Sequence, residues 1–147
     1  NDVIRKSAIT YFGSVINDNN YDRLFKLSEY GGTTWDARAE AVIQLGKYAK
    51  NKPETLDHFI NLLEDKSRDI RRNSVRMIGI HGNKSHLGYL DEVLAMDPIL
   101  SRSVRSAKKR ILNPPKKIKK KGPEKELEEA KKLIGDIRKL VKNKGGN

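Results

Sequence analysis

The sequence repeats itself every 33 residues, and this period constrains the fold more than any other feature. An arginine, a small residue three places later and a glycine five places further on recur together. The recurring residues are Arg5, Arg38 and Arg71; Ala8, Ala41 and Ser74; and Gly13, Gly46 and Gly79. Self-similarity at a fixed period of roughly 20 to 50 residues is typical of repeat arrays. The chain is therefore predicted to stack copies of one structural unit.

A fourth copy follows with one extra residue. It places Val104 and Arg105 at the apolar and arginine positions, and Asn113 stands where the glycine would be. The second half of this copy is absent from its expected place, because the chain then enters a stretch rich in proline and lysine. The array is predicted to hold about three and a half units.

Each copy is predicted to form a helical hairpin. Apolar and small residues recur at helical spacing in the first half of each copy, and again after a short loop. The predicted first helices are residues 2–13, 34–48, 68–80 and 100–112. Gly46 and Gly79 are predicted to end their helices, since glycine takes the left-handed conformation there without steric cost. The fold class is all-α: a short right-handed α-solenoid with an additional C-terminal helix.

The predicted boundaries follow the period and the composition. Hairpins are expected at about residues 1–32, 33–66, 67–98 and 99–112, a linker at 113–123, and an amphipathic helix at 124–143.

The repeat consensus, apolar-Arg-x-x-(Ala/Ser)-x-x-apolar-apolar-Gly followed by Leu-x-x-apolar-apolar, resembles the HEAT repeat over about residues 2–112. In such arrays consensus positions usually serve stacking between neighbouring units. The small residues are predicted to lie where helices cross closely. The four arginines, Arg105 included, are predicted to cap or pair between neighbouring repeats.

A narrower resemblance involves Tyr30-Gly31-Gly32, Leu62-Leu63-Glu64-Asp65 with Asp69-Ile70-Arg71, and the stretch from Tyr89 to Ala107. These segments look like the C-terminal HEAT-like region of zinc aminopeptidases of the aminopeptidase N type. The resemblance implies a helical bowl that follows a catalytic domain and shapes substrate access. The HExxH and GAMEN motifs of that family are absent from this sequence, so no catalytic residue is carried over.

Few residues in the sequence could support catalysis or metal binding. The chain has no cysteine and three histidines, and His81 and His86 lack a third ligand at metal spacing. Asp57 and His58 are neighbours that point in different directions on a helix, and both are predicted to be solvated. We expect no catalytic residue, no metal and no cofactor in this chain.

The net charge of +12 is concentrated late in the chain. Residues 113–147 hold 12 Lys and Arg against 5 Asp and Glu, which leaves +7 for this tail and +5 for the rest. The lysine cluster comprises Lys116, Lys117, Lys119, Lys120 and Lys121. Because prolines flank it, the cluster is predicted to be a solvated linker. The alternative is contact with an anionic partner such as nucleic acid.

The segment after the linker is predicted to be an amphipathic helix with an acidic start and a basic end, which suits the helix dipole. Its apolar face is predicted to comprise Leu127, Ala130, Ile134, Ile137 and Val141, at 3-4-3-4 spacing. This face needs a partner. We expect it to cap the open end of the solenoid, where an apolar face would otherwise meet water; docking on another chain is the alternative.

Three functions are compatible with these features. The first, implied by the narrower resemblance, is a non-catalytic accessory region of a larger zinc aminopeptidase-like protein. The chain begins without Met and within a repeat, so we expect it to be a piece of a longer protein. The second is a stand-alone protein-interaction scaffold that uses a groove lined by the second helices. The third is a nucleic-acid binder. No segment approaches the ~20 apolar residues that span a bilayer, and the lack of cysteine is compatible with the cytoplasm.

Overall fold

The computed structural model describes residues 2–29, 34–115 and 123–144, and the chain divides into two compact units. The first unit is Asn1–Pro115 and the second is Lys116–Asn147. Each unit is described by itself.

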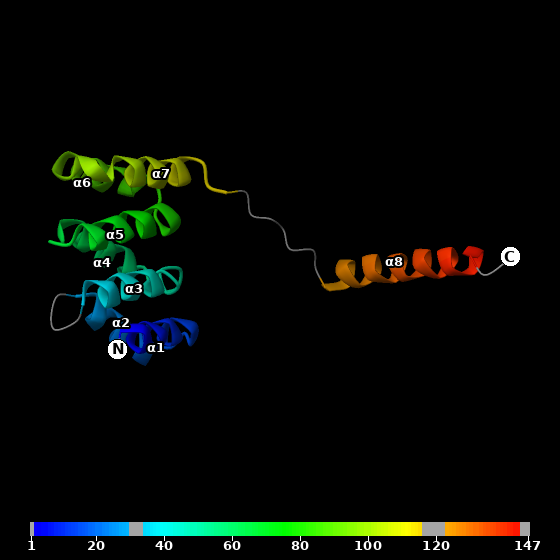
Figure 1. The fold of residues 1–147 in the computed structure, drawn as a ribbon. Helices are drawn as coiled ribbons and strands as arrows, with labels where there is room; N and C mark the ends of the chain where they lie inside the picture. The colour runs from blue at the N-terminus through cyan, green and yellow to red at the C-terminus, as the bar shows by residue number, and fades with distance from the viewer. Residues whose placement is uncertain (1, 30–33, 116–122, 145–147) are drawn as a thin grey trace. The chain divides into compact units, whose positions relative to one another are not determined.

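The first unit consists of helices that alternate in the predicted order (Figure 1). Three single turns of 3-10 helix, η1, η2 and η3, join them. The elements are α1 (Asp2–Ser14), α2 (Asp18–Ser28), α3 (Trp35–Leu45), α4 (Glu54–Asn61), η1 (Leu62–Glu64), α5 (Arg68–His81), η2 (Lys84–His86), α6 (Leu87–Met96), η3 (Pro98–Leu100) and α7 (Ser101–Leu112). Throughout the described ranges no strand occurs. The predicted all-α stack of helical hairpins is confirmed.

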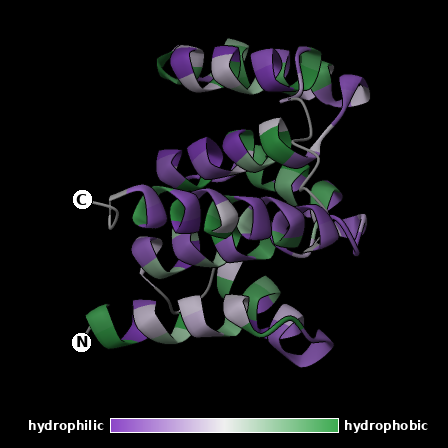
Figure 2. Cartoon of the chain, turned by 90° about the vertical axis from the view of Figure 1, so that its right-hand side faces the viewer, coloured by the Kyte–Doolittle hydropathy of each residue, from purple (hydrophilic) through white to green (hydrophobic). Residues whose placement is uncertain are grey.

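The first helices of the hairpins form one continuous stack, in which α1 contacts α3, α3 contacts α5, and α5 contacts α7 (Figure 1). Each second helix packs mainly against the first helix that follows it: α2 on α3, α4 on α5 and α6 on α7. Hydrophilic and hydrophobic stretches alternate along the helices, as expected for helices with one buried face (Figure 2). The largest fully buried side chains are Tyr48, Phe59, Ile9, Leu24, Leu45, Ile70, Ile78, Leu90 and Leu100.

Asparagines begin two of the shorter elements. The side chain of Asn17 accepts the backbone N–H of Asn20 at 2.8 Å, which satisfies one of the free donors at the start of α2. At η2 the side chain of Asn83 accepts the N–H of Ser85, and the backbone N–H of Asn83 donates to His86 Nδ1 at 3.1 Å. These caps define where the second helices of the first and third hairpins start.

The prediction that the consensus glycines end helices in the left-handed conformation is wrong. Gly46 follows α3 with φ of −54°, which is right-handed, and Gly79 lies inside α5. These glycines instead permit close approach between successive first helices. A Cβ on Gly79 would lie 2.6 Å from Cα of Ala107 in α7, and one on Gly46 would lie 2.6 Å from Sδ of Met77 in α5. A Cβ on Gly13 would clash in the same way with Gln44 in α3.

The second unit contains α8 (Pro123–Lys144), which extends one residue beyond the predicted helix at each end. Its first turn carries Glu124 and Glu126, which favour the positive end of the helix dipole. The apolar side chains predicted to form one face are not buried within this unit. The described helices include none that combines the length and the apolar character needed to cross a bilayer.

Candidate binding surfaces

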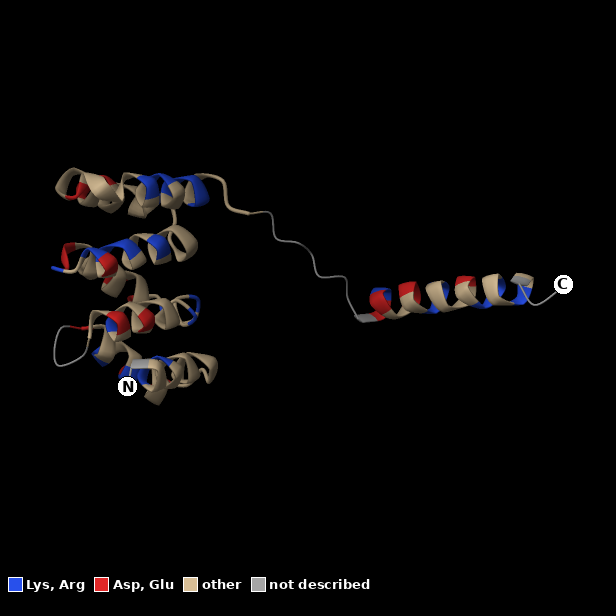
Figure 3. Cartoon of the chain, viewed as in Figure 1, with Lys and Arg blue, Asp and Glu red and all other residues tan. Residues whose placement is uncertain are grey.

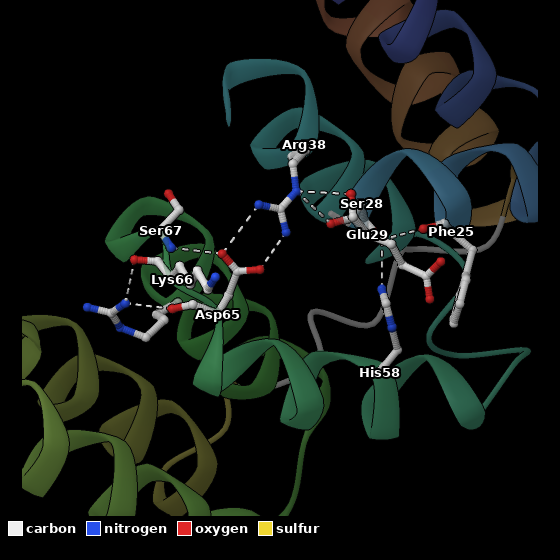
Figure 4. Close-up of polar contacts among 9 residues, drawn as sticks. Phe25, Ser28, Glu29, Arg38, His58, Asp65, Lys66 and Ser67 are labelled. Carbon is white, nitrogen blue, oxygen red and sulfur yellow. Dashed lines mark hydrogen bonds and ion pairs between the residues drawn. The ribbon is translucent and has the colours of Figure 1, made fainter. Parts of the chain in front are cut away.

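The consensus arginine of the second hairpin, Arg38, joins two hairpins through its guanidinium (Figure 4). Its Nε donates to the backbone carbonyls of Ser28 at 3.2 Å and Glu29 at 3.1 Å, at the end of α2. Its Nη2 and Nη1 donate to the carboxylate of Asp65 at 2.5 and 3.3 Å, just after η1. The side chains of Arg38 and Asp65 are 5% and 11% exposed. This buried, forked pair ties the end of one second helix to the end of the next.

Arg71 repeats this arrangement one hairpin later. Its Nη1 donates to the carbonyls of Asp65 at 2.6 Å and Lys66 at 3.1 Å, and its Nη2 donates to Asp97 Oδ2 at 2.5 Å. Arg68 adds a second bond to Asp97 at 3.0 Å. The aspartates recur 32 residues apart, at the C-terminal side of each second helix. The arginine period was visible in the sequence, but its acidic partners were missed, although their own recurrence could have revealed them.

The two aspartates are held ionised by this ladder. Burial raises the pKa of Asp65, but hydrogen bonds from Arg38 and the backbone of Ser67 outweigh it, and the pKa lies below its usual value. Hydrogen bonds from Arg71 and then Arg68 lower the pKa of Asp97. Both guanidinium groups of the ladder thus bind acceptors inside the fold, although Nε of Arg71 has no partner among the described residues. The ladder serves stacking.

The outer copies of the consensus positions lie in a different environment from the inner copies. Arg5 is exposed and reaches Thr34 Oγ1 at 3.5 Å, and Arg105 is exposed and forms no ion pair with the described residues. Ala8 is exposed, whereas Ala41 and Ser74 are fully buried between helices. The sequence motif is the same in each copy, but only the inner copies have neighbours on both sides.

The first helix, α1, presents an exposed apolar surface that we call the leading face: Ile4, Ala8 and Tyr11. Ile4 and Tyr11 are 67% and 63% exposed. The residues 33 and 66 places later are all buried, because they contact the preceding first helix: Ala37, Ala41 and Gln44 in α3, and Ile70, Ser74 and Met77 in α5. The leading face of α1 thus has the composition of an internal stacking surface.

The opposite end of the stack has a different character. On α7 the exposed residues are mainly basic or small and polar, and include Arg102, Arg105, Ser106, Lys109 and Arg110. Apolar side chains are exposed at this end as well, Ile99 in η3 by 65% and Leu112 at the end of α7 by 51%. The capping role of α8 stays a prediction.

Between α5 and α7 lies a groove of about 330 Å³ that is lined by four arginines. We call it the α5–α7 groove: Arg72 and Arg76 come from α5, and Arg102 and Arg110 from α7. Figure 3 shows the blue of Lys and Arg gathered on these two helices. Arg72 pairs with Asp69 at 2.6 Å on its own helix. The groove thus brings together four arginines from two helices that are separate in the sequence.

His58 is buried, so the prediction that it is solvated is wrong, while its neighbour Asp57 is exposed. Its Nε2 lies 2.7 Å from Ser28 Oγ, and its ring lies 4.0 Å from that of Phe25 (Figure 4). Ser28 donates its hydroxyl to the carbonyl of Phe25 at 2.6 Å, so a neutral imidazole can donate to Ser28. Burial lowers the pKa of His58 to about 4. His58 is thus a neutral core residue that joins α2 to α4.

A smaller groove of about 220 Å³, the α4–α6 groove, lies between the α4–η1 segment and α6. Tyr89 and Met96 line it and are 42% and 57% exposed, and the carboxylates of Glu64 and Glu92 lie at the same groove. It combines apolar side chains with negative charge on the second helices, where a partner of the scaffold was expected.

The other predicted positions divide into three groups. His86 serves as a helix cap, and His81 ends α5. In the described part of the chain, no three His, Cys, Asp or Glu side chains gather as metal ligands would. The lysine cluster at 116–121 lies outside the described residues. On α8, Leu127, Ile134, Ile137 and Val141 are 51–67% exposed, and Ala130 is exposed as well.

The stacked hairpins, their shared first-helix layer and the arginine ladder define an α-helical repeat scaffold. The family model for HEAT repeats matches residues 21–108, and the chain belongs to the HEAT-repeat family. HEAT repeats commonly mediate protein interactions, and the family is generally non-catalytic. Neither a curated protein nor a solved structure matches the chain.

Proposed function

We propose that this chain is a non-catalytic HEAT scaffold that continues a longer helical stack through the leading face of α1. The occupant of that face is the first helix of another HEAT hairpin, with glycine or another small residue opposite Tyr11. The observation that carries the proposal is the exposure of Ile4, Ala8 and Tyr11 at positions that are buried in both inner copies.

The internal interfaces specify this occupant. Gln44 and Met77 stand 33 and 66 residues after Tyr11, and they lie against Gly13 and Gly46 of the preceding first helices. A helix that covers α1 in the same way needs a small residue at the corresponding point, because a Cβ there would clash. Exposed apolar area of this kind stabilises association by about 25 cal/mol per Å² when it is buried.

Hydrogen exchange on a longer chain tests the proposal. The chain is extended by the roughly 40 residues encoded upstream, about one hairpin, and its α1 amides are compared with those of the present chain. We expect slower exchange in α1 and a higher melting temperature. Replacing Ile4 and Tyr11 together by Lys should abolish both gains.

The matched control adds two lysines at exposed positions on other elements, Asn19→Lys and Asn51→Lys. It should leave the protection of α1 intact. An extension that leaves exchange in α1 unchanged, or gains that survive the lysine pair on the leading face, would show that this face is not a stacking surface.

We further propose that the parent is a zinc aminopeptidase-like protein and that this chain is its C-terminal accessory region in the cytoplasm. The support is the sequence likeness at Leu62–Asp65, Asp69–Arg71 and Tyr89–Ala107. In that case the reading frame upstream encodes an HExxH zinc-binding helix. A parent sequence without that motif contradicts the proposal and leaves the stacking role of α1 unaffected.

A stand-alone interaction scaffold is the second candidate, and the α4–α6 groove favours it. Its exposed Tyr89 and Met96 beside Glu64 and Glu92 suit a peptide with an apolar side chain next to basic residues. A pull-down with the parent chain and with Tyr89→Ala tests this function. It is supported over the accessory role if the parent chain retains a stable partner that contains no peptidase segment and the variant loses that partner.

A further inference from the structure

We propose that the α5–α7 groove binds the phosphate backbone of a nucleic acid. This inference is independent of the leading face, because it concerns a different surface and needs no longer stack. The groove lies on the first-helix layer, where α5 and α7 run side by side.

The side chains that line the groove are almost entirely hydrogen-bond donors. Besides its four arginines the groove contains Asn73, Ser103, Ser106 and Ala107, and no carboxylate lines it. Arg76, Arg102 and Arg110 form no ion pair within the described ranges, and Arg72 alone has an acidic partner, Asp69. Three arginines without an ion-pair partner, with Arg72 beside them, create a positive potential around about 330 Å³ that attracts an anion.

The identity of these cations points to phosphate. Lysine outnumbers arginine by 20 to 11 in this chain, yet all four cations of the groove are arginines. The planar guanidinium fork binds phosphate oxygens in pairs, which the compact ammonium of lysine cannot do. Arg102 and Arg110 are two turns apart on α7, about 12 Å along the helix axis, so their guanidinium groups can bind successive phosphates of one backbone.

The lining favours a nucleic acid over an acidic protein. Protein interfaces depend on aromatic and large apolar anchors, and Ala107 is the only apolar residue that lines this groove. Nucleic-acid interfaces are polar and strongly positive. Since no aromatic side chain lines the groove to stack on bases, recognition would be through phosphates and independent of sequence.

The sequence around α7 supplies further positive charge. Residues 98–123 hold ten Lys and Arg and no Asp or Glu. Of these, only Lys108 forms an ion pair, with Asp91 of α6, in the part of this segment that the structure describes. A long segment of one sign increases the affinity for a polyanion and steers its approach.

Binding of a fluorescein-labelled 24-base-pair DNA duplex of arbitrary sequence to the full chain tests the proposal by fluorescence anisotropy. The Kd is measured at several salt concentrations between about 50 and 200 mM. We expect binding that weakens steeply with salt. The triple variant Arg76→Gln, Arg102→Gln, Arg110→Gln should raise the Kd tenfold or more at 100 mM salt. It should also reduce the log–log salt slope by about 2 to 3, since each neutralised phosphate contributes about 0.9 to that slope.

The matched control removes three charges from exposed lysines on other elements: Lys26→Gln, Lys47→Gln and Lys50→Gln. It should change the Kd less than threefold. Equal weakening by both triple variants would show a general charge effect and overturn the proposal. So would the absence of binding at 50 mM salt, or competition by polyglutamate as effective as that by unlabelled duplex, which would assign the groove to an acidic protein. Unchanged circular dichroism spectra and melting temperatures establish that both variants are folded.

Discussion

Replacing Gly79 by alanine should weaken the packing of α5 on α7 by forcing the two helices apart. A Cβ at this position would lie 2.6 Å from Cα and 2.7 Å from Cβ of Ala107. The obstacle is backbone, which no change of side-chain rotamer can remove. The last hairpin must therefore shift as a body, or the helix α5 must bend.

The size of the effect follows from two opposing terms. Carbon atoms in contact lie about 3.5–4.0 Å apart, so α7 must retreat by about 1 Å. Overpacking of this kind costs about 1–3 kcal/mol. Alanine within a helix gains about 1 kcal/mol over glycine. With a central overpacking cost of about 2 kcal/mol, the net loss should be about 1 kcal/mol and at most about 2 kcal/mol. This lowers the melting temperature by about 4 °C, and by at most about 8 °C, at about 4 °C per kcal/mol.

Gly88 in α6 provides the matched control, because a Cβ there meets nothing within 4 Å. Gly88→Ala carries the same chemical change in a helix without the steric clash, and should stabilise the protein by up to about 1 kcal/mol. Urea unfolding followed by far-UV circular dichroism measures both variants against the parent chain. The sign of the change should differ between the two glycines.

A Gly79→Ala variant as stable as the parent would refute the close-approach role. A shift of both variants in the same direction would do so too, because it would mean that helix propensity alone decides the outcome. In the first case the glycine would have no packing role that the structure can explain.

Two further predictions concern buried polar groups. Asp65→Asn leaves the guanidinium of Arg38 buried without a counter-charge and should cost about 3–5 kcal/mol in urea unfolding. Loss of the exposed pair in Asp69→Asn should cost less than ~0.5 kcal/mol; equal losses would contradict the buried ladder. Protonation of the folded His58 is disfavoured, with pKa about 4 against about 6.5 unfolded. The free energy of unfolding should thus fall by about 2 kcal/mol from pH 7 to pH 5. His58→Gln should flatten this pH dependence. If the variant keeps the pH dependence of the parent chain, His58 is not the group responsible for it.

The 33-residue period was sufficient to predict the stack of helical hairpins. Helix formation depends on local spacing of apolar residues, and an array repeats the same local solution. The helices α3 and α5 therefore lie close to their predicted ranges. Single Gly positions were misjudged, because Gly46 and Gly79 have two possible uses, a left-handed helix end and a close helix crossing. Only the distance to the neighbouring helix distinguishes them.

The candidate surfaces were harder to predict than the fold. The arginines of the α5–α7 groove are spread over residues 72–110, and none belongs to the consensus positions. From the sequence we expected any anionic partner at the lysine cluster, since a run of one charge is visible in the sequence and a groove between two helices is not. The crossing of α5 and α7 decides which arginines meet.

The repeat, the helical class and the recurrent arginine can all be identified from the order of residues along the chain. Which copies of each position are buried becomes known only from the packing of the hairpins. Ala8 and Ala41 have the same place in the same motif, yet one is exposed and the other is enclosed between helices. Periodicity is a property of the chain, whereas burial depends on what stacks on each side. The physical reason is that a repeat unit cannot bury its own apolar face and needs a neighbour to do so.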